Sequence, residues 1–214
     1  MIRNNLAILM SERGIRNSYL SAKTGISKNT ISATSSNDGK MIQLETINKI
    51  CQVLQVEPGQ FFSYLPFDLE IKVFCDNLIY DEENVGVDEI GLPVKQPVIN
   101  ELSLDVYVSK VYLNGSKDFS LSGSLVSPVN LYGSVPPIIH IGGSDNDSLE
   151  FSKLWASIPK PFQIDIEKVL KSKIFDEIYG ILSGKNQDYD FSKWHFDIEF
   201  YADTYLNDLE VKFF

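Results

Sequence analysis

The sequence NSYLSAKTGISKNTISA, residues 17–33, decides the fold, because it predicts two short helices joined by a tight turn. Gly25 ends the first helix, since glycine adopts the left-handed conformation without a steric penalty. Ser27 is a good N-cap for a second helix, which then continues without a breaker. Leu20, Ile26 and Ile31 are the apolar residues that we expect to lock the two helices together.

The second of these helices is left with polar residues on its outward side. Side chains such as Lys28, Asn29 and Ser32 supply donors and acceptors that suit base edges in the major groove of DNA, where each base pair shows its own pattern. We therefore expect base contacts from Lys28, Asn29, Ser32 and Ala33, with Ser36 at the edge of the set.

Residues near the ends of the two helices, and in the loop that follows, are placed to meet phosphate groups. Such contacts fix the position of a protein on DNA without reading its sequence. For any one of these residues, an ordinary solvated surface role is the alternative. The predicted phosphate contacts are Arg16, Asn17, Lys23, Ser27, Thr30 and Lys40.

Charge is distributed unevenly along the chain. Residues 1–66 hold seven Lys and Arg against four Asp and Glu, a net charge of +3, whereas residues 67–214 carry −13. Phosphate contacts are local, and salt screens charges that lie more than about 8 Å away. A protein that is acidic in total can therefore bind DNA through one basic module.

Residues 1 to about 65 resemble the lambda-repressor and Cro-like helix-turn-helix domain of the XRE family, which is common in repressors of phages and mobile elements. The resemblance rests on the order of five predicted helices, with a loop at residues 36–40 after the third. It implies an all-α domain that binds double-stranded DNA. The predicted helices cover residues 2–13, 19–24, 27–33, 44–54 and 58–62.

The fourth of these helices carries an apolar stripe with the spacing of a buried helical face. Pro58 follows where a proline in the first turn of a helix costs no hydrogen bond. The stripe, which we expect to be core, consists of Leu44, Ile47, Ile50, Cys51 and Leu54.

Length and composition indicate a second globular domain over residues 66–214. The chain has 214 residues, of which 43% are hydrophobic and 22% charged, and both values are typical of globular proteins. No run approaches the eighteen apolar residues of a membrane span. The first predicted helix begins at the N-terminus and leaves no room for a signal peptide, so we expect a cytoplasmic protein.

Residues 66–214 favour an α+β fold, in which an antiparallel sheet packs against one long helix. Asn114-Gly115 is a strong hairpin signal, while residues 81–96 and 142–148 are predicted to be loosely structured. The long helix is predicted from about Gln163 to Leu182, with an apolar face of Ile166, Val169, Leu170, Ile174, Ile178 and Ile181. Segments with the alternation of half-buried strands are residues 67–74, 102–108, 119–125, 196–200 and 209–213.

Metal and cofactor sites are not indicated. Cys51 and Cys75 fall in different predicted domains and read as small buried hydrophobes rather than a disulfide. His140 and His195 lack the paired spacing of zinc ligands, and each reads as a satisfied sheet residue rather than an acid or base. The acids Asp145, Asp147 and Glu150 lack the pattern of a calcium loop, so a solvated acidic loop is expected.

One enzymatic alternative is the serine-lysine self-cleaving peptidase of some phage repressors and LexA-like proteins, in which a buried neutral lysine activates the serine. Ser116 and Lys153 have a suitable spacing of 37 residues, but Ser134 and Lys171 have the same spacing. The Ala-Gly or Cys-Gly cleavage dipeptide of those proteins is missing upstream. The signal is therefore not specific, and we expect no enzymatic activity.

These patterns predict a transcriptional repressor of phage or mobile-element type. A single helix-turn-helix reads few base pairs, so we expect it to bind a palindromic operator as a dimer. Residues 66–214 are therefore expected to be an oligomerisation or sensing domain, with the dimer formed through them. The acidic second domain offers a surface to a basic protein such as an antirepressor. The alternative is an antitoxin-like protein, whose acidic domain binds a protein partner and whose DNA binding is autoregulatory.

Overall fold

The computed structural model describes residues 1–37, 41–87, 89–127, 129–130, 136–183 and 196–202. The chain divides into two compact units, Met1–Asp68 and Leu69–Phe214. Among the described helices, none is both long and apolar enough to cross a membrane.

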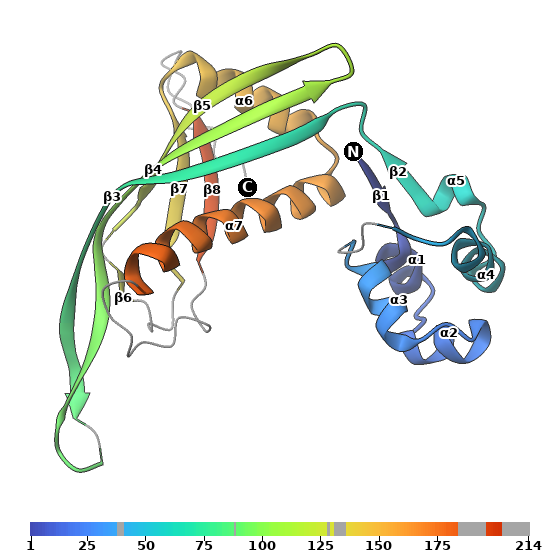
Figure 1. The fold of residues 1–214 in the computed structure, drawn as a ribbon, viewed down its shortest axis with the longest axis horizontal. Coiled ribbons are helices and arrows are strands. Elements are labelled where there is room, and N and C mark those ends of the chain that lie inside the picture. The colour runs from blue at the N-terminus through green and yellow to red at the C-terminus, as the bar shows by residue number, and fades with distance from the viewer. Residues whose placement is uncertain (38–40, 88, 128, 131–135, 184–195, 203–214) are drawn as a thin grey trace. The chain divides into compact units, whose positions relative to one another are not determined.

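The first unit consists of five short helices and a two-stranded ribbon (Figure 1). In chain order it contains β1 (Ile2–Asn4), α1 (Leu6–Glu12), α2 (Asn17–Thr24), α3 (Lys28–Ser35), α4 (Leu44–Leu54), α5 (Pro58–Phe61) and β2 (Phe62–Tyr64). β1 pairs antiparallel with β2, so that Ile2 lies opposite Tyr64 and Asn4 opposite Phe62. The prediction that the first helix starts at Ile2 is therefore wrong, because residues 2–4 find backbone partners in a segment about sixty residues away.

The core of the first unit lies between its helices. The fourth helix has the predicted bounds and buries four of its five stripe residues, Ile47, Ile50, Cys51 and Leu54. The fifth, Leu44, is 83% exposed, so its assignment to the core is wrong. Leu44 is the first residue of α4 and lies one turn beyond the buried part of the stripe. The other members of this core cluster are Leu6, Leu9, Met10, Leu20, Ile31, Val56 and Phe61.

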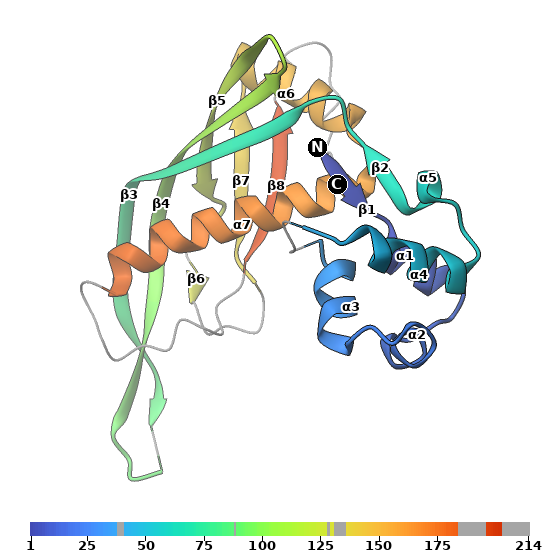
Figure 2. The same cartoon turned by 45° about the vertical axis from the view of Figure 1, so that its right-hand side comes forward.

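The second unit is built on a sheet of six described strands with the order β3-β4-β5-β7-β8, in which β6 also pairs with β4 (Figures 1 and 2). β4 and β5 form a hairpin from Ser103 opposite Ser124 to Tyr112 opposite Gly115. The predicted hairpin is confirmed, but its two-residue turn is Leu113-Asn114 rather than Asn114-Gly115, because Gly115 already pairs with Tyr112 as the first residue of β5. The strands are β3 (Asp68–Val87), β4 (Pro93–Tyr112), β5 (Gly115–Leu125), β6 (Val129–Asn130), β7 (Ile138–Gly143) and β8 (Asp197–Ala202).

The last pair of strands is parallel, which the expectation of an antiparallel sheet did not include. Ile138 of β7 lies opposite Asp197 of β8, and the pairing continues to Gly143 opposite Ala202. Parallel neighbours need a long connection, and here it contains two helices, α6 (Asn146–Ser157) and α7 (Lys160–Ser183). The prediction of a single helix is therefore wrong as well, although α7 covers the predicted range.

The start of α6 explains the acidic cluster that was predicted to be a solvated loop. Asp145 caps the helix, accepting hydrogen bonds from the amide of Ser148 at 2.8 Å and from its hydroxyl at 2.7 Å. The bond from the Ser148 amide lowers the pKa of Asp145. Asp147 accepts from the amide of Ser120 at 2.9 Å, and Glu150 pairs with Lys117. Each acid therefore has a structural partner.

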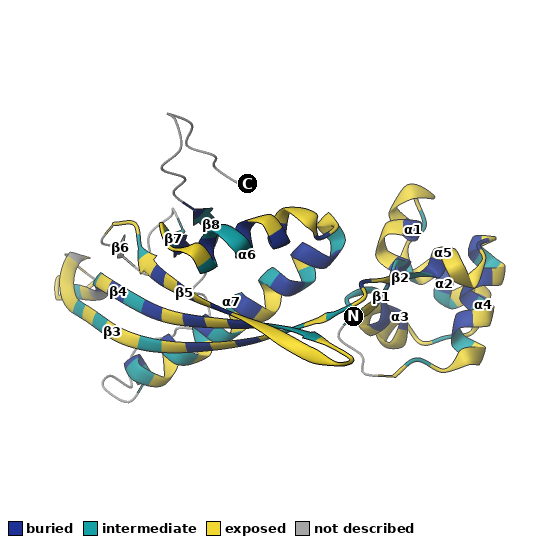
Figure 3. Cartoon of the chain, turned by 90° about the horizontal axis from the view of Figure 1, so that it is seen from above, coloured by how far each residue is buried: buried dark blue, intermediate teal, exposed yellow. Residues whose placement is uncertain are grey.

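Both helices of the second unit contribute side chains to its core, as the dark blue positions in Figure 3 show. Phe151 and Trp155 of α6 pack against Phe200 of β8, with ring centroids 5.5 and 4.5 Å apart. The buried stripe of α7 consists of Phe162, Ile166, Leu170, Ile174, Ile178 and Leu182. It follows a spacing of four residues, so Val169, predicted on the buried face, is instead 48% exposed.

Residues 81–96, predicted to be loosely structured, mostly belong to strands. β3 extends to Val87 and β4 starts at Pro93, so these two strands form a ribbon that continues past the rest of the sheet (Figure 2). Acidic residues are uncommon in strands, so this segment does not show the usual sequence pattern of a strand. The sequence also does not reveal cross-strand contacts such as the hydrogen bond that Asn100 Nδ2 donates to Asp81 at 2.8 Å. The strand predicted at residues 209–213 lies outside the described residues.

Candidate nucleic-acid interface

The turn between α2 and α3 is fixed by its own side chains. Gly25 ends α2 with φ of 73°, which is a left-handed conformation. The Ser21 hydroxyl donates to the Ile26 carbonyl at 2.7 Å, and the Thr24 hydroxyl donates to the Leu20 carbonyl at 2.7 Å. The Thr24 hydroxyl also accepts from the Ile26 amide at 3.2 Å, so the turn is held by bonds among residues 20–26.

The inner side of α3 anchors the helix in the core. Ser27 is its N-cap and accepts from the Thr30 amide at 3.1 Å. Ile31 is fully buried and Thr34 is buried one turn later. Because these two positions are three residues apart, they define one face of the helix and leave the opposite face outward.

The predicted base-contacting residues lie together on that outward face. Lys28, Asn29, Ser32 and Ala33 are all exposed, and their spacing of one, four and five residues places them on one side of a helix. Ser36 caps the C-terminal end of α3, where its hydroxyl donates to the carbonyls of Ser32 at 3.1 Å and Ala33 at 3.2 Å.

Three of the predicted phosphate contacts lie at the two ends of α2. Arg16 is exposed immediately before α2, and Asn17 is the first residue of a helix that has no side-chain cap. The amides of the first turn of α2 are therefore not occupied by a side-chain cap, and such amides attract anions. Lys23 is exposed at the end of α2, with its ammonium 5.8 Å from the centre of the Tyr19 ring. Lys40 lies outside the described residues.

Ser27 and Thr30, also predicted to contact phosphate, already bond to each other. Their hydroxyls are 2.8 Å apart and both residues are exposed. They line a hollow of about 440 Å³ beside α3, which Gln43, Glu45 and Lys49 close on the other side. A hydrogen bond from Lys49 at 2.7 Å lowers the pKa of Glu45. The negative charge of Glu45 in this hollow is therefore balanced by the positive charge of Lys49.

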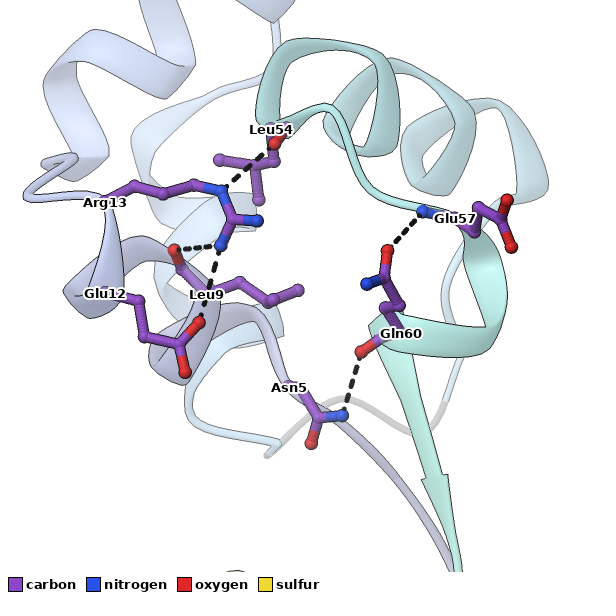
Figure 4. A network of polar contacts seen from close by, with 7 residues as sticks. All are labelled: Asn5, Leu9, Glu12, Arg13, Leu54, Glu57 and Gln60. Carbon is purple, nitrogen blue, oxygen red and sulfur yellow. Dashed lines mark hydrogen bonds and ion pairs between the residues drawn. The ribbon is translucent and has the colours of Figure 1, made fainter.

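The electrostatic character of the interface follows from the sequence around it. Residues 13–37 contain Arg13, Arg16, Lys23 and Lys28 and no Asp or Glu. Arg13 is committed to the fold, because its guanidinium donates to the carbonyls of Leu54 and Leu9, each at 3.1 Å (Figure 4). The other three cations of this stretch, Arg16, Lys23 and Lys28, are all exposed.

Sequence analysis missed two residues that hold α3 at its C-terminal end. The buried Asn4 donates from Nδ2 to the Thr34 carbonyl and to Asn37 Oδ1, both at 2.7 Å. Asn37 has a left-handed conformation, with φ of 58°, and its side chain pairs with the backbone of Asn4. The only sequence signal was an asparagine at the end of a helix, a residue that tolerates this conformation.

Comparison with known proteins identifies the family of this domain. A profile of the Cro/C1-type helix-turn-helix DNA-binding domain matches residues 5–66. Residues 5–66 are a Cro/C1-type helix-turn-helix domain. A protein from Bacteroides fragilis, whose crystal structure is described as that of a "putative DNA-binding protein", is 30% identical. The match covers all of that chain and 29% of this one, with a TM-score of 0.28. No curated protein matches the chain.

The Cro/C1-type domain accounts for nearly all of the first unit, Met1–Asp68. In the second unit, Ser116 and Lys153 are exposed on β5 and α6, and Lys171 pairs with Asp197 at 3.0 Å. His140 contacts Glu199, its neighbour across β7 and β8, at 3.0 Å. Ser134 and His195 lie outside the described residues, and no group of three metal-ligating side chains occurs among those that are described.

The two cysteines are free thiols. Cys51 is buried in the first unit and Cys75 is half-buried in the second. Burial raises the pKa of both thiols. Neither is therefore activated as a nucleophile.

Proposed function

We propose that this chain is a sequence-specific transcriptional regulator that reads bases through Lys28, Asn29, Ser32 and Ala33 of α3. The observation that carries the proposal is the face of α3 on which these four exposed residues lie, opposite the buried Ile31 and Thr34. A lysine can donate to guanine and an asparagine can pair with adenine in the major groove. Arg16, Asn17, Lys23, Ser27 and Thr30, together with Lys40, hold the phosphates on either side.

The regulator is a repressor of phage or mobile-element type that acts in the cytoplasm as a dimer. A single recognition helix contacts few base pairs, whereas two copies on half-sites about 34 Å apart combine their affinities. The second unit, which performs no chemistry, supplies the dimer contact. The expected operator is therefore a palindrome whose half-sites lie one helical turn apart.

Genome-wide mapping of binding sites in the native host tests this function. The expected result is a small set of sites upstream of genes, which share one palindromic sequence and lose occupancy in a Lys28→Ala, Asn29→Ala variant. Uniform occupancy, or sites that the double variant still occupies, would contradict it. Lys168→Ala is the matched control, because Lys168 is an exposed lysine on α7 of the second unit.

The charge of the second unit favours one further candidate. Residues 67–214 carry a net charge of −13, which suits a basic protein partner such as a toxin. In that case the chain is an antitoxin with autoregulatory DNA binding. Purification from the native host separates the two functions, because an antitoxin is recovered with a stoichiometric basic partner and a repressor is recovered as a homodimer.

A further inference from the structure

The sheet of the second unit ends on a long strand with an open edge. β3 spans twenty residues, Asp68–Val87, and is the terminal strand of the sheet order. Its inner edge pairs with β4, and no described strand pairs with its outer edge. The unpaired N–H and C=O groups of such an edge form a template on which another strand can add.

The first half of β3 presents three exposed side chains in alternation. Lys72, Phe74 and Asp76 are exposed, whereas Ile71 and Val73 are buried and Cys75 is half-buried. Phe74 is 51% exposed and its ring meets that of Tyr107 edge to face, with centroids 6.0 Å apart. No salt bridge within the described residues involves Lys72 or Asp76.

The order of Lys72, Phe74 and Asp76 allows this segment to pair with a second copy of itself. When two identical strands pair antiparallel about a two-fold axis at Phe74, that residue lies opposite its own copy. Lys72 of each strand then lies opposite Asp76 of the other, on the same exposed face. Two ion pairs therefore flank one aromatic pair, and Glu70 lies opposite Leu78.

The two identical strands could also pair about a two-fold axis at residue 72, 73, 75 or 76, and each of these four alignments places like charges opposite each other. Such pairs destabilise a sheet, so they select the alignment centred on Phe74 among those centred on residues 72–76. That alignment pairs residues 68–80 and leaves the acidic stretch of Asp81, Glu82 and Glu83 outside the overlap. The opposed pairs in the other four are Lys72 with Lys72, Glu70 with Asp76, Asp68 with Glu82, and Asp76 with Asp76.

We propose that β3 docks a second copy of this chain by antiparallel edge pairing centred on Phe74, so that two six-stranded sheets become one. The proposal rests on the homodimer of the proposed function and names its contact surface. Charge complementarity between Lys72 and Asp76 favours a second copy of this chain as the partner. A basic strand of another protein would instead place a positive charge opposite Lys72.

Charge exchange tests the pairing directly in the full chain, by sedimentation equilibrium over a range of concentrations. The wild type is expected to be a dimer. Lys72→Asp or Asp76→Lys alone creates two symmetric like-charge pairs, and each should weaken the dimer about tenfold or more. The variant with both changes restores opposite charges and should recover most of the wild-type affinity.

Disulfide capture tests the alignment independently. In a Cys75→Ser background, Phe74→Cys places two thiols on residues whose Cα atoms lie about 4.5–5.5 Å apart, within the range of a disulfide. Mild oxidation should link the copies. Asp76→Cys in the same background is the matched control, because its two copies lie four residues, or about 13 Å, apart along the strands and should not link.

The charge variants and the wild type can each overturn the proposed pairing of β3. A dimer that is insensitive to both single charge variants, or a double variant no better than the singles, would overturn β3 pairing while leaving the homodimer intact. A monomeric wild type would overturn both the pairing and the homodimer. Lys168→Asp, on α7, should leave the dimer unchanged. Base recognition by α3 is measured separately, so its failure is distinguishable from either outcome.

Discussion

The side-chain amide of Asn37 pairs with both backbone groups of Asn4, thirty-three residues earlier in the chain. Asn37 Oδ1 accepts from the Asn4 amide at 2.8 Å, and Asn37 Nδ2 donates to the Asn4 carbonyl at 3.1 Å. The side-chain amide of Asn37 therefore pairs with Asn4 of β1 in the same way as the backbone of a neighbouring strand would. Because Asn4 also donates to the Thr34 carbonyl, the pair connects the end of the recognition helix to the β1–β2 ribbon.

Removing the Asn37 side chain should loosen α3. Asn37→Gly keeps the left-handed backbone but leaves the buried amide of Asn4 with fewer partners, a loss of about 1–3 kcal/mol. Hydrogen exchange of residues 28–37 should accelerate, and the free energy of unfolding of the first unit should fall. Asn48→Ala, on an exposed position of α4, should change stability by less than about 0.5 kcal/mol. Equal exchange in both variants would contradict the role of Asn37.

Lys23 should contribute affinity without base preference. Lys23→Ala removes one expected phosphate contact, so the slope of log affinity against log salt should decrease by about one, and all duplexes should be weakened alike. Titration of the operator and of an unrelated duplex at several salt concentrations measures both effects. Lys168→Ala should leave the slope unchanged, and a change in base preference with Lys23→Ala would refute its assignment to phosphate.

Gly142 should be indispensable for the β7–β8 pair. A Cβ atom at this position would lie 1.9 Å from the Tyr201 carbonyl oxygen, and φ is +129°. Gly142→Ala should therefore lower the free energy of unfolding of the second unit by about 3 kcal/mol or more. Gly180→Ala in α7 meets open space and should raise it by about 0.5–1 kcal/mol. Thermal unfolding of both variants distinguishes them, and equal effects would show that backbone conformation at Gly142 is not limiting.

Stability of the second unit should depend on the charge of Asp145. Its pKa in the folded state is below the ordinary value of 3.8, so its contribution is present above that value and is lost as pH falls through the folded pKa. Asparagine also caps helices but carries no charge. In urea unfolding at pH 3 to 7, the advantage of the wild type over Asp145→Asn should be greatest at neutral pH and shrink below about pH 4. An advantage that is independent of pH would contradict this.

The parts of the fold that were predicted correctly depend on signals within a few residues. Gly25 and Ser27 mark the end of α2 and the start of α3 by their own backbone preferences, and α4 shows a clear helical period. These are also the signals that place Lys28, Asn29, Ser32 and Ala33 on one exposed face. The helix-turn-helix could therefore be recognised before any tertiary contact was known.

The features that were missed depend on partners far away in the sequence. Residues 2–4 have no strong preference for a strand and form β1 because Phe62–Tyr64 lies beside them. The Asn4 and Asn37 pair spans 33 residues, and the parallel alignment of β7 with β8 depends on the length of the α6–α7 connection. The first turn of α6 looked like an acidic loop, since the capping role of Asp145 appears only when Ser148 bonds to it.

The central claim, that α3 reads bases, is tested most directly by selection from a pool of random duplexes with the full chain. The wild type should enrich one palindromic sequence. The Lys28→Ala, Asn29→Ala variant, with unchanged unfolding, should retain salt-dependent binding but enrich none. Enrichment of the same sequence by both proteins, or no preference by the wild type even at low salt, would show that α3 does not read bases.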